Sequence, residues 1–261
     1  AERLKGPAGW KPAPDVAGLV RQGNQVSTAN QRAHSDEDIA GTSLLMLYGL
    51  KGVAAYTTHA QMLGQSDPDV NTALLEALDF MTKPDPTLEE LVGWCMKLGE
   101  VNFKVMEMLD TGHTSTFGHP EPTEVLITSR PGKAILASGH EIGDLKALLE
   151  QTEGKGINVY THGELLPAHA YPALKKFDHL VGNYGGGWQD QQDDFESFPG
   201  SILMTSNCII EPRDSYKDRI FTTGPVGWPG VTHLTDRAYG PVIEAAQAAE
   251  GFGSNGESKT I

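Results

Sequence analysis

From residue 133 onward, short apolar segments alternate with segments of helical character. We expect strands at 133–138, 157–161, 179–183, 201–206 and 219–223. Helical segments are expected at 142–152, 167–177, 188–197 and 236–249. Strand, helix and strand in succession form a βαβ unit, in which the strands are parallel and the helices cover the sheet. The pattern therefore predicts an α/β domain with a parallel, Rossmann-like sheet.

Three of the expected strands run directly into side chains that can bind a metal ion. The segment 133–138 leads into His140, the segment 157–161 into Glu164, and the segment 201–206 into Cys208. Ligands of open α/β sheets bind beyond the carboxyl ends of the strands. The sequence therefore predicts that an imidazole, a carboxylate and a thiol gather at one edge of the sheet and form a metal site.

Each of these residues also has an ordinary structural explanation. His140 could hydrogen-bond to a neighbouring loop, Glu164 could stabilise the first turn of a helix, and Cys208 could be a small buried apolar residue. Their joint placement at strand ends favours the metal site. A mixed set of soft and hard ligands suits iron or zinc better than magnesium or calcium, and three protein ligands would suffice for a catalytic zinc. The spacing of the three residues does not choose between these metals.

Other polar residues carry weaker hypotheses. His162 is expected to orient a metal ligand from behind it or to lie on the surface, and His169 is expected to be a surface residue. The glycine-rich segment 182–188 follows a strand and opens a helix, as phosphate-binding loops do. It lacks the dinucleotide fingerprint and the Walker lysine, so nucleotide binding is the weaker interpretation. Cys95 is expected in the core of a helix bundle.

The first half of the chain favours helices. Ser35 begins a capping-box pattern before a long helix whose apolar residues cover more than one face, so we expect that helix to be largely buried. Asp67-Pro68 begins a second helix, and a second capping box at Thr87 begins a third, with Gly112 as its expected end. Three long helices joined by short loops predict an antiparallel bundle.

A connector rich in turn residues separates the two halves, and we place the domain boundary near residue 125. The expected organisation is a loop-rich lead-in at 1–34 with a short helix near 16–21, a helical bundle at 35–124, and an α/β domain at 125–261.

Charge and composition exclude several classes of partner. The formal net charge of −14 disfavours nucleic acid and anionic membranes. The sequence has no uninterrupted apolar run of the length that a transmembrane helix needs. Its two cysteines cannot build a disulfide framework, which favours a reducing cytoplasm.

Eight stretches of the chain resemble the hybrid-cluster protein family, also called prismane proteins or hydroxylamine reductases. They occur in the family's order and cover the chain from about residue 40 to 250, which makes the resemblance highly specific. The stretches are Leu47–Tyr56, Val101–Met106, Ala137–His140, Leu148–Gly154, Val159–His169, His179–Gly185, Met204–Ile210 and Val226–Gly230.

The resemblance implies a cofactor, a reaction and partners. Members of the family carry a hybrid iron–sulfur–oxygen cluster, and its ligands include a His, a Glu and a Cys that correspond to His140, Glu164 and Cys208. Members reduce hydroxylamine to ammonia and water with electrons from a second, ordinary iron–sulfur cluster, and reduction of nitric oxide is also attributed to them. The resemblance thus implies hydroxylamine as a small-molecule substrate and an electron-donor protein as a partner.

The chain departs from the family pattern at both ends. It has no closely spaced cysteines near its start to hold the second cluster. The remaining hybrid-cluster ligands, three cysteines and a second glutamate, lie in a third domain that would follow residue 261. One thiolate at the site cannot hold a multi-iron cluster that relies on several. We therefore expect this chain to be the middle of a longer protein, carrying half of the cluster site and inactive without the missing domain.

Two other hypotheses stay open. The chain could be a non-catalytic structural or assembly module that binds no cluster alone. It could also be related to nickel–iron carbon monoxide dehydrogenase, whose fold is similar but whose motifs match less well.

Overall fold

The computed structural model describes residues 9–27, 36–206 and 208–253 of the 261-residue chain. The chain divides into two compact units, 1–112 and 113–261, and each is described by itself. The division falls within helix α5 (Leu88–Phe117), whereas the sequence places the domain boundary in the loop that follows this helix. The expected helix near 16–21 is present as α1 (Val16–Asn24). Residues 259–261, expected to begin a strand, lie outside the described residues.

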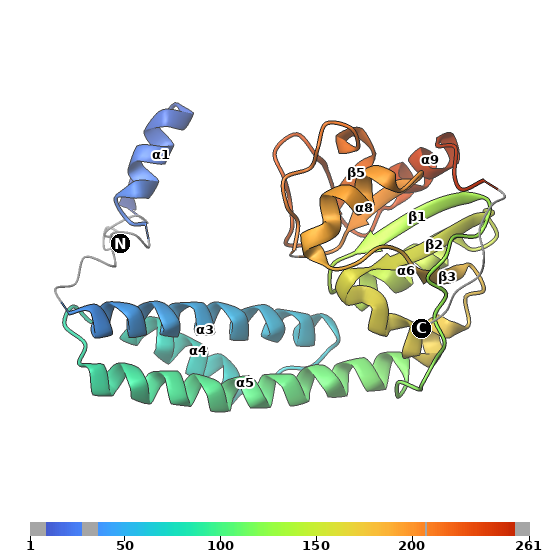
Figure 1. The fold of residues 1–261 in the computed structure, drawn as a ribbon. Coiled ribbons are helices and arrows are strands. Elements are labelled where there is room, and N and C mark those ends of the chain that lie inside the picture. The colour runs from blue at the N-terminus through green and yellow to red at the C-terminus, as the bar shows by residue number, and fades with distance from the viewer. Residues whose placement is uncertain (1–8, 28–35, 207, 254–261) are drawn as a thin grey trace. The chain divides into compact units, whose positions relative to one another are not determined.

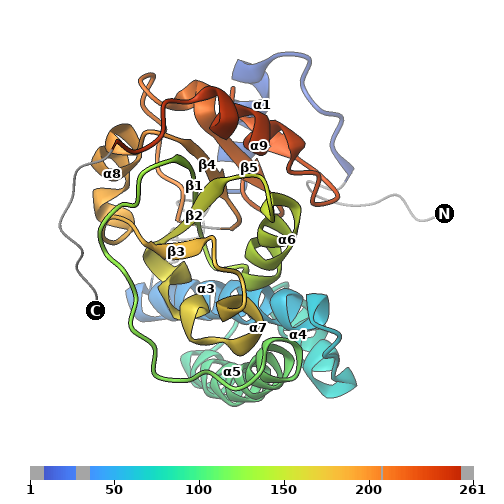
Figure 2. The same ribbon diagram turned by 90° about the vertical axis from the view of Figure 1, so that its right-hand side faces the viewer.

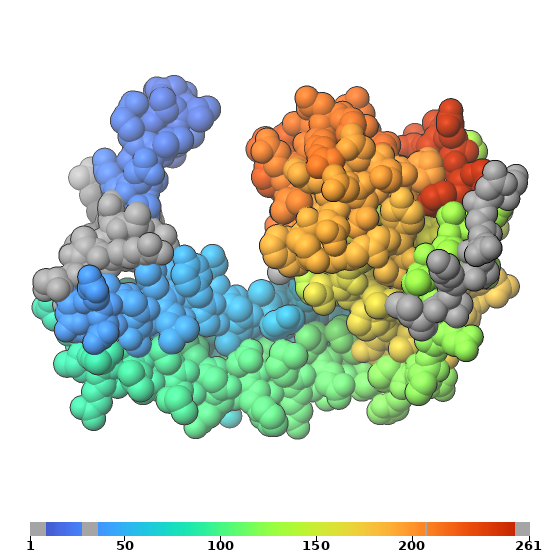
Figure 3. Space-filling model, in the orientation of Figure 1, coloured from blue at the N-terminus to red at the C-terminus, as the bar shows by residue number. Residues whose placement is uncertain are grey.

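Three helices form the first unit, namely α3 (Glu37–Met62), α4 (Pro68–Phe80) and the larger part of α5. Consecutive helices run in opposite directions, and α3 and α5 lie side by side (Figures 1 and 3). Two apolar clusters hold them together, one around Val53, Val70 and Val105 and the other around Met46 and Leu91. These contacts form the predicted bundle.

The starts of the helices follow the predicted capping chemistry with one change. Asp67 accepts hydrogen bonds from the first turn of α4, and Thr87 and Glu90 bond to each other's backbone N–H groups, as a capping box requires. At α3 the cap is Asp36, whose Oδ1 accepts from the backbone N of Asp38 at 3.0 Å. The predicted cap, Ser35, lies outside the described residues.

Two expectations for these helices are wrong. Helix α5 does not end at Gly112 but continues to Phe117, and Gly118, with a φ of +88°, follows it. Gly112 instead permits a close approach, because a Cβ at this position would lie 2.9 Å from the Cβ of Leu63. Helix α3 is not largely buried either, since α4 and α5 cover only one stripe of it and leave Leu45 63% exposed.

Among the described residues, α3 is also the one helix long and apolar enough to cross a membrane by length and composition alone. Core helices of soluble proteins meet the same criterion, so this is weak evidence for a membrane span. The expectation that the chain contacts no membrane stays a prediction.

The second unit contains a six-stranded sheet in which every pair of neighbours is parallel, in the order β3-β2-β1-β4-β5-β6. This confirms the predicted α/β fold class. The strands are β1 (Lys133–Ser138), β2 (Ile157–His162), β3 (Leu180–Asn183), β4 (Ser201–Met204), β5 (Ile220–Thr223) and β6 (Thr232–Leu234). Strand β6 was not expected from the sequence, because it has three residues and two of them are exposed.

Helices cover both faces of this sheet. Helix α8 (Gln191–Ser197) lies on one side, while α6 (Ile142–Thr152) and α9 (Gly240–Ala248) lie on the other (Figure 2). Alternate residues of a strand point to opposite faces, and Leu136 and Ile202 pack with Phe195 of α8 on the first face. The expected helix 167–177 is instead a 3-10 segment, η2 (Gly163–Ala170), followed by the short α7 (Pro172–Lys175). The start of the expected helix 188–197 is the 3-10 turn η3 (Trp188–Asp190).

The strand order reverses its direction between β1 and β4. From β1 the chain adds β2 and β3 on one side, and it then returns to add β4, β5 and β6 on the other. The loops that leave β1 and β4 consequently diverge and open a crevice at the carboxyl ends of these strands, which is the usual ligand site of such sheets.

Candidate functional site

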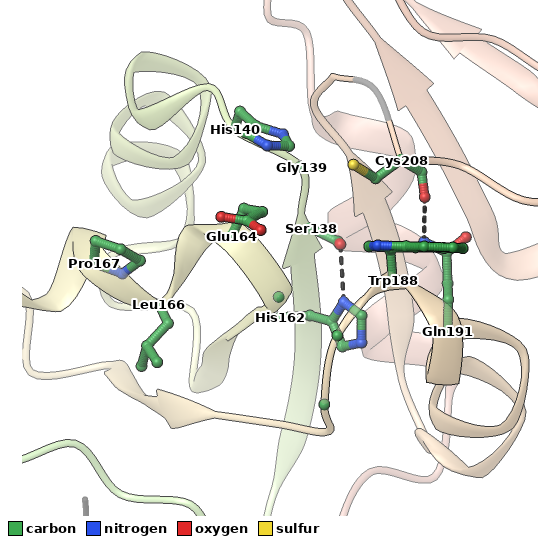
Figure 4. A pocket seen from close by; sticks show the side chains of 13 residues that line it. Ser138, Gly139, His140, His162, Glu164, Leu166, Pro167, Trp188, Gln191 and Cys208 are labelled. Carbon is green, nitrogen blue, oxygen red and sulfur yellow. Dashed lines mark hydrogen bonds between the residues drawn. The ribbon is translucent and has the colours of Figure 1, made fainter.

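A cavity of about 310 Å³ lies at this crevice. Its lining includes all three residues that the sequence singles out as metal ligands, His140, Glu164 and Cys208. They come from the segments that follow β1, β2 and β4, and Figure 4 shows them around one opening. The predicted meeting of the three strand ends at one place is therefore present in the fold.

The end of β4 holds His140 in place. The backbone N of His140 donates to Ser206 Oγ at 2.6 Å, and the same oxygen lies 3.4 Å from the ring Nδ1. Gly139 makes this approach possible. Its φ is +112°, and a Cβ there would lie 2.7 Å from the backbone N of Ser206. The turn after β1 thus requires glycine and directs the next residue to the cavity.

Glu164 lies in the first turn of η2, directly after Gly163, whose φ is +58°. An acidic side chain is favoured at this position because backbone N–H groups at the start of a helix carry partial positive charge. Glu164 can therefore stabilise the first turn of η2 and also line the cavity.

Cys208 is half-buried and has a φ of +70°, in the left-handed region that non-glycine residues rarely adopt. Burial raises the pKa of its thiol, and the negative charge of Glu164 raises that pKa further. In the absence of a cation the thiol is held protonated. A nearby metal ion would favour the thiolate and reverse this effect.

We predict that Glu164→Gln shifts the alkylation of Cys208 by iodoacetamide to lower pH, because the substitution removes a charge that raises the thiol pKa. The measurement uses the Cys95→Ser background, in which Cys208 is the sole thiol of this chain. Glu153→Gln, at an exposed acid far from the cavity lining, is the matched control. An unchanged pH profile in the Glu164 variant would contradict the electrostatic coupling.

His162 and His169 are both buried. His162 is 1% exposed, with Nδ1 3.0 Å from Ser138 Oγ and Nε2 3.2 Å from Asp194 Oδ2. Burial lowers its pKa, and the hydrogen bond and charge of Asp194 oppose this in part. His162 also lines the cavity, and its role in orienting a ligand stays a prediction.

The expectation that His169 is a surface residue is wrong. It is 7% exposed, and its Nε2 lies 2.9 Å from Thr161 Oγ1 of β2. The 3-10 turns of η2 bring it back against the sheet. Burial lowers its pKa to about 4.

Sequence reasoning missed the part of the cavity that follows β3. Gly186, Gly187, Trp188 and Gln191 line it, and Gln191 binds the backbone on both sides of Ile209 through Cys208 O and Ile210 N. The glycine-rich pattern of 182–188 does mark this loop, for which the sequence offers phosphate binding only as a weaker interpretation. In the structure the loop instead forms one wall of the cavity that His140, Glu164 and Cys208 also line.

His140, Glu164 and Cys208 offer one imidazole, one carboxylate and one thiol as metal donors in the cavity lining. Among the described residues, no three His, Cys, Asp or Glu side chains lie close enough together to chelate one ion. This disfavours the three-ligand zinc site. An imidazole, a carboxylate and a thiol spread around a larger cavity fit instead the separate metal atoms of a cluster, and their chemistry suits iron.

Comparison with known proteins identifies relatives over the whole length of the chain. The model of the Prismane/CO dehydrogenase family matches residues 3–259. A protein named hydroxylamine reductase from Burkholderia lata is 54% identical over 256 residues, which cover 98% of this chain and 46% of that relative. Proteins of the same name from Thermodesulfovibrio yellowstonii and Acidithiobacillus ferrooxidans are each 50% identical, over 97% and 100% of this chain and 47% of each relative.

The chain thus spans about half the length of the relatives it matches. The resemblance found from the eight sequence stretches is confirmed, and the family implies iron–sulfur cofactors. Because the family model matches almost every residue, the chain belongs to the Prismane/CO dehydrogenase family.

Proposed function

We propose that this chain supplies part of the cluster site of an iron–sulfur oxidoreductase that reduces hydroxylamine to ammonia and water. The observation that carries the proposal is the convergence of His140, Glu164 and Cys208 on one cavity at the point where the strand order reverses. The relatives named hydroxylamine reductase support the choice of substrate. Nitric oxide is a second substrate to be tested, and the cytoplasm is the proposed compartment.

The volume of the cavity agrees with a cofactor site. Hydroxylamine has only one nitrogen and one oxygen as heavy atoms, so a cavity of about 310 Å³ is far larger than the substrate needs. The proposed hybrid iron–sulfur–oxygen cluster would take up the remaining space and supply the two electrons that the reaction consumes together with two protons.

The residues of this chain have defined tasks on this proposal. His140, Glu164 and Cys208 hold part of the iron. Ser206 fixes the backbone of His140 through its 2.6 Å hydrogen bond, and Gly139 allows the turn that this contact needs. On this proposal, the other ligands and the second iron–sulfur cluster belong to the rest of the full-length protein.

The test uses the full-length protein and replaces His140, Glu164 and Cys208 with alanine, singly and together. After anaerobic reconstitution with iron and sulfide, we expect the triple variant to lose the electron paramagnetic resonance signal of the hybrid cluster. Hydroxylamine reduction should fall by more than about 100-fold, because even residues behind a metal ligand commonly account for 10- to 100-fold.

The matched control is Cys95→Ala, since Cys95 packs against the core of the helix bundle in the other unit. This variant should retain both the cluster signal and the activity. An unchanged cluster signal in the triple variant would rule the proposal out.

A second function is compatible with the absence of a chelating group among the described residues. The chain would then act as a structural module that binds no cluster by itself. This hypothesis predicts no stoichiometric iron and no reductase activity in the isolated chain after reconstitution. In the full-length protein it predicts an iron content that does not change when His140, Glu164 and Cys208 are replaced with alanine, whereas the proposed function predicts a loss of iron.

A further inference from the structure

The backbone of Cys208 adopts a conformation that needs external support. Its φ is +70°, and among the described residues only Asp236 and Arg237 share a positive φ without being glycine. An L-residue in this region brings its Cβ close to the following carbonyl oxygen, so the conformation persists only where surrounding contacts enforce it. Figure 4 shows the sulfur atom of Cys208 directed toward the space bordered by His140 and Glu164.

One side chain makes two hydrogen bonds to the backbone at and just after Cys208, and these can support this conformation. Gln191 Nε2 donates to the carbonyl oxygen of Cys208 at 2.7 Å, and Gln191 Oε1 accepts from the backbone N of Ile210 at 3.0 Å. The side chain of Gln191 is 1% exposed and lines the cavity. Both hydrogen bonds are part-buried, so their loss would leave partly buried backbone groups without these partners.

The helix that carries Gln191 is itself held by contacts in its middle and just beyond its end. Asp194, one turn after Gln191, accepts from the backbone N of Gly186 at 2.8 Å and lies 3.2 Å from Nε2 of His162. The guanidinium of Arg219 donates to the carbonyl oxygens of the adjacent Phe195 and of Gly200 after the helix, each at 2.7 Å. Gln191 is thus presented to the Cys208 loop from a rigid element.

We propose that Gln191 is a positioning residue, which holds Cys208 in its left-handed conformation and keeps the thiol directed into the cavity. This role rests on the proposed function, in which Cys208 is an iron ligand. A carboxamide donates through its NH2 group and accepts through its oxygen, so Gln191 can bind one carbonyl and one N–H at the same time. A glutamate at 191 would keep the second bond and lose the first, and a leucine would lose both.

The first test measures alkylation of Cys208 by iodoacetamide in the Cys95→Ser chain at fixed pH. Gln191→Leu should raise the rate roughly tenfold, because two part-buried hydrogen bonds no longer restrict the loop. Gln191→Glu should raise it by a smaller factor. If the leucine variant does not fold, as judged by circular dichroism, Gln191→Met takes its place.

The neighbouring Gln192 provides a matched control. Its Nε2 also donates to the backbone of this loop, at Glu211 O and 2.7 Å, but this contact is exposed. Gln192→Leu should leave the alkylation rate within about twofold of the parent, since exposed hydrogen bonds contribute little. Equal rates in the Gln191 and Gln192 variants would overturn the proposal.

The second test separates positioning from a general contribution to stability. Glycine adopts a φ of +70° without strain, so Cys208→Gly removes the strain that Gln191 is proposed to hold in place. Loss of Gln191 lets the loop relax and relieves this strain only when residue 208 is cysteine. We therefore expect Gln191→Leu to lower the melting temperature more in the Cys208→Gly background than in the Cys208 background. An equal decrease in both would show that Gln191 is merely structural and would overturn the proposal.

Neither test involves iron. The two proposals can therefore fail independently. If both tests give the expected result but the cluster signal is unchanged in the triple alanine variant of the full-length protein, the positioning role of Gln191 stands and the proposed function is ruled out. If the cluster signal is lost but either test fails, only the positioning role of Gln191 is ruled out.

Discussion

Gly139→Ala should lower the free energy of unfolding of the α/β unit by about 3 kcal/mol or more, since left-handed strain and overpacking each cost one to several kcal/mol. Gly139 has a φ of +112°, and a Cβ there would lie 2.6 Å from Thr205 Oγ1 and 2.7 Å from the backbone N of Ser206. Both neighbours are fully buried, and the backbone N lies two residues after the end of the central strand β4. Relief therefore requires β1 and β4 to separate where His140 is held.

Gly154→Ala is the control that separates backbone strain from the clash. Gly154 has a φ of +72°, yet a Cβ there would have no atom within 4 Å. We expect this variant to lose about 1 kcal/mol, the cost of the left-handed conformation alone. Urea unfolding followed by circular dichroism gives both values. Equal losses in the two variants would show that the contact between Gly139 and Ser206 does not stabilise the fold.

The strands themselves could be predicted from the sequence, whereas the pairing of β1 with β4 could not. The segments that became β1 and β2 were predicted within one residue at each end, because apolar runs between turn residues define such strands well. The order of the strands was not predictable. The order depends on which later strand pairs with β1. That strand is β4, which begins at Ser201, 63 residues after the end of β1.

The candidate site divides in a similar way. His140, Glu164 and Cys208 were identified because parallel strands necessarily bring their carboxyl ends to one edge. Gln191 was missed because a side chain that hydrogen-bonds to a distant backbone leaves no pattern in the local sequence. The left-handed backbone of Cys208 was equally invisible, since the residue type that usually reveals such a conformation is glycine.

His169 shows why local composition can mislead. It lies near the start of the segment 167–177, which is expected to be helical, and a surface position is the expectation for it. Pro167 lacks a backbone donor and favours the tighter 3-10 segment that is observed. That segment buries the imidazole against Thr161, and this burial makes the stability of the unit depend on pH.

We expect the α/β unit to lose about 3 kcal/mol of stability between pH 6.5 and pH 4 through His169 alone, by proton linkage. Burial lowers the pKa of His169 from 6.5 to about 4 in the folded protein, and a hydrogen bond to the backbone of Gly182 opposes this in part. Within this range the unfolded chain binds the proton and the folded chain does not. Stability therefore falls as the pH falls, and above pH 7 this histidine has no effect.

His169→Gln removes the titration while keeping a group that can hydrogen-bond to Thr161. Urea unfolding at pH 7 and pH 4.5 should show a smaller loss of stability in this variant than in the parent, and the exposed His119→Gln should behave as the parent does. Two other groups contribute in both proteins. Burial lowers the pKa of His162, which acts in the same direction, and raises the pKa of Glu141, which acts in the opposite one. Because the comparison between variants cancels these contributions, an equal pH dependence in the parent and His169→Gln would show that His169 can be protonated without unfolding, through a movement of η2 that exposes it to water.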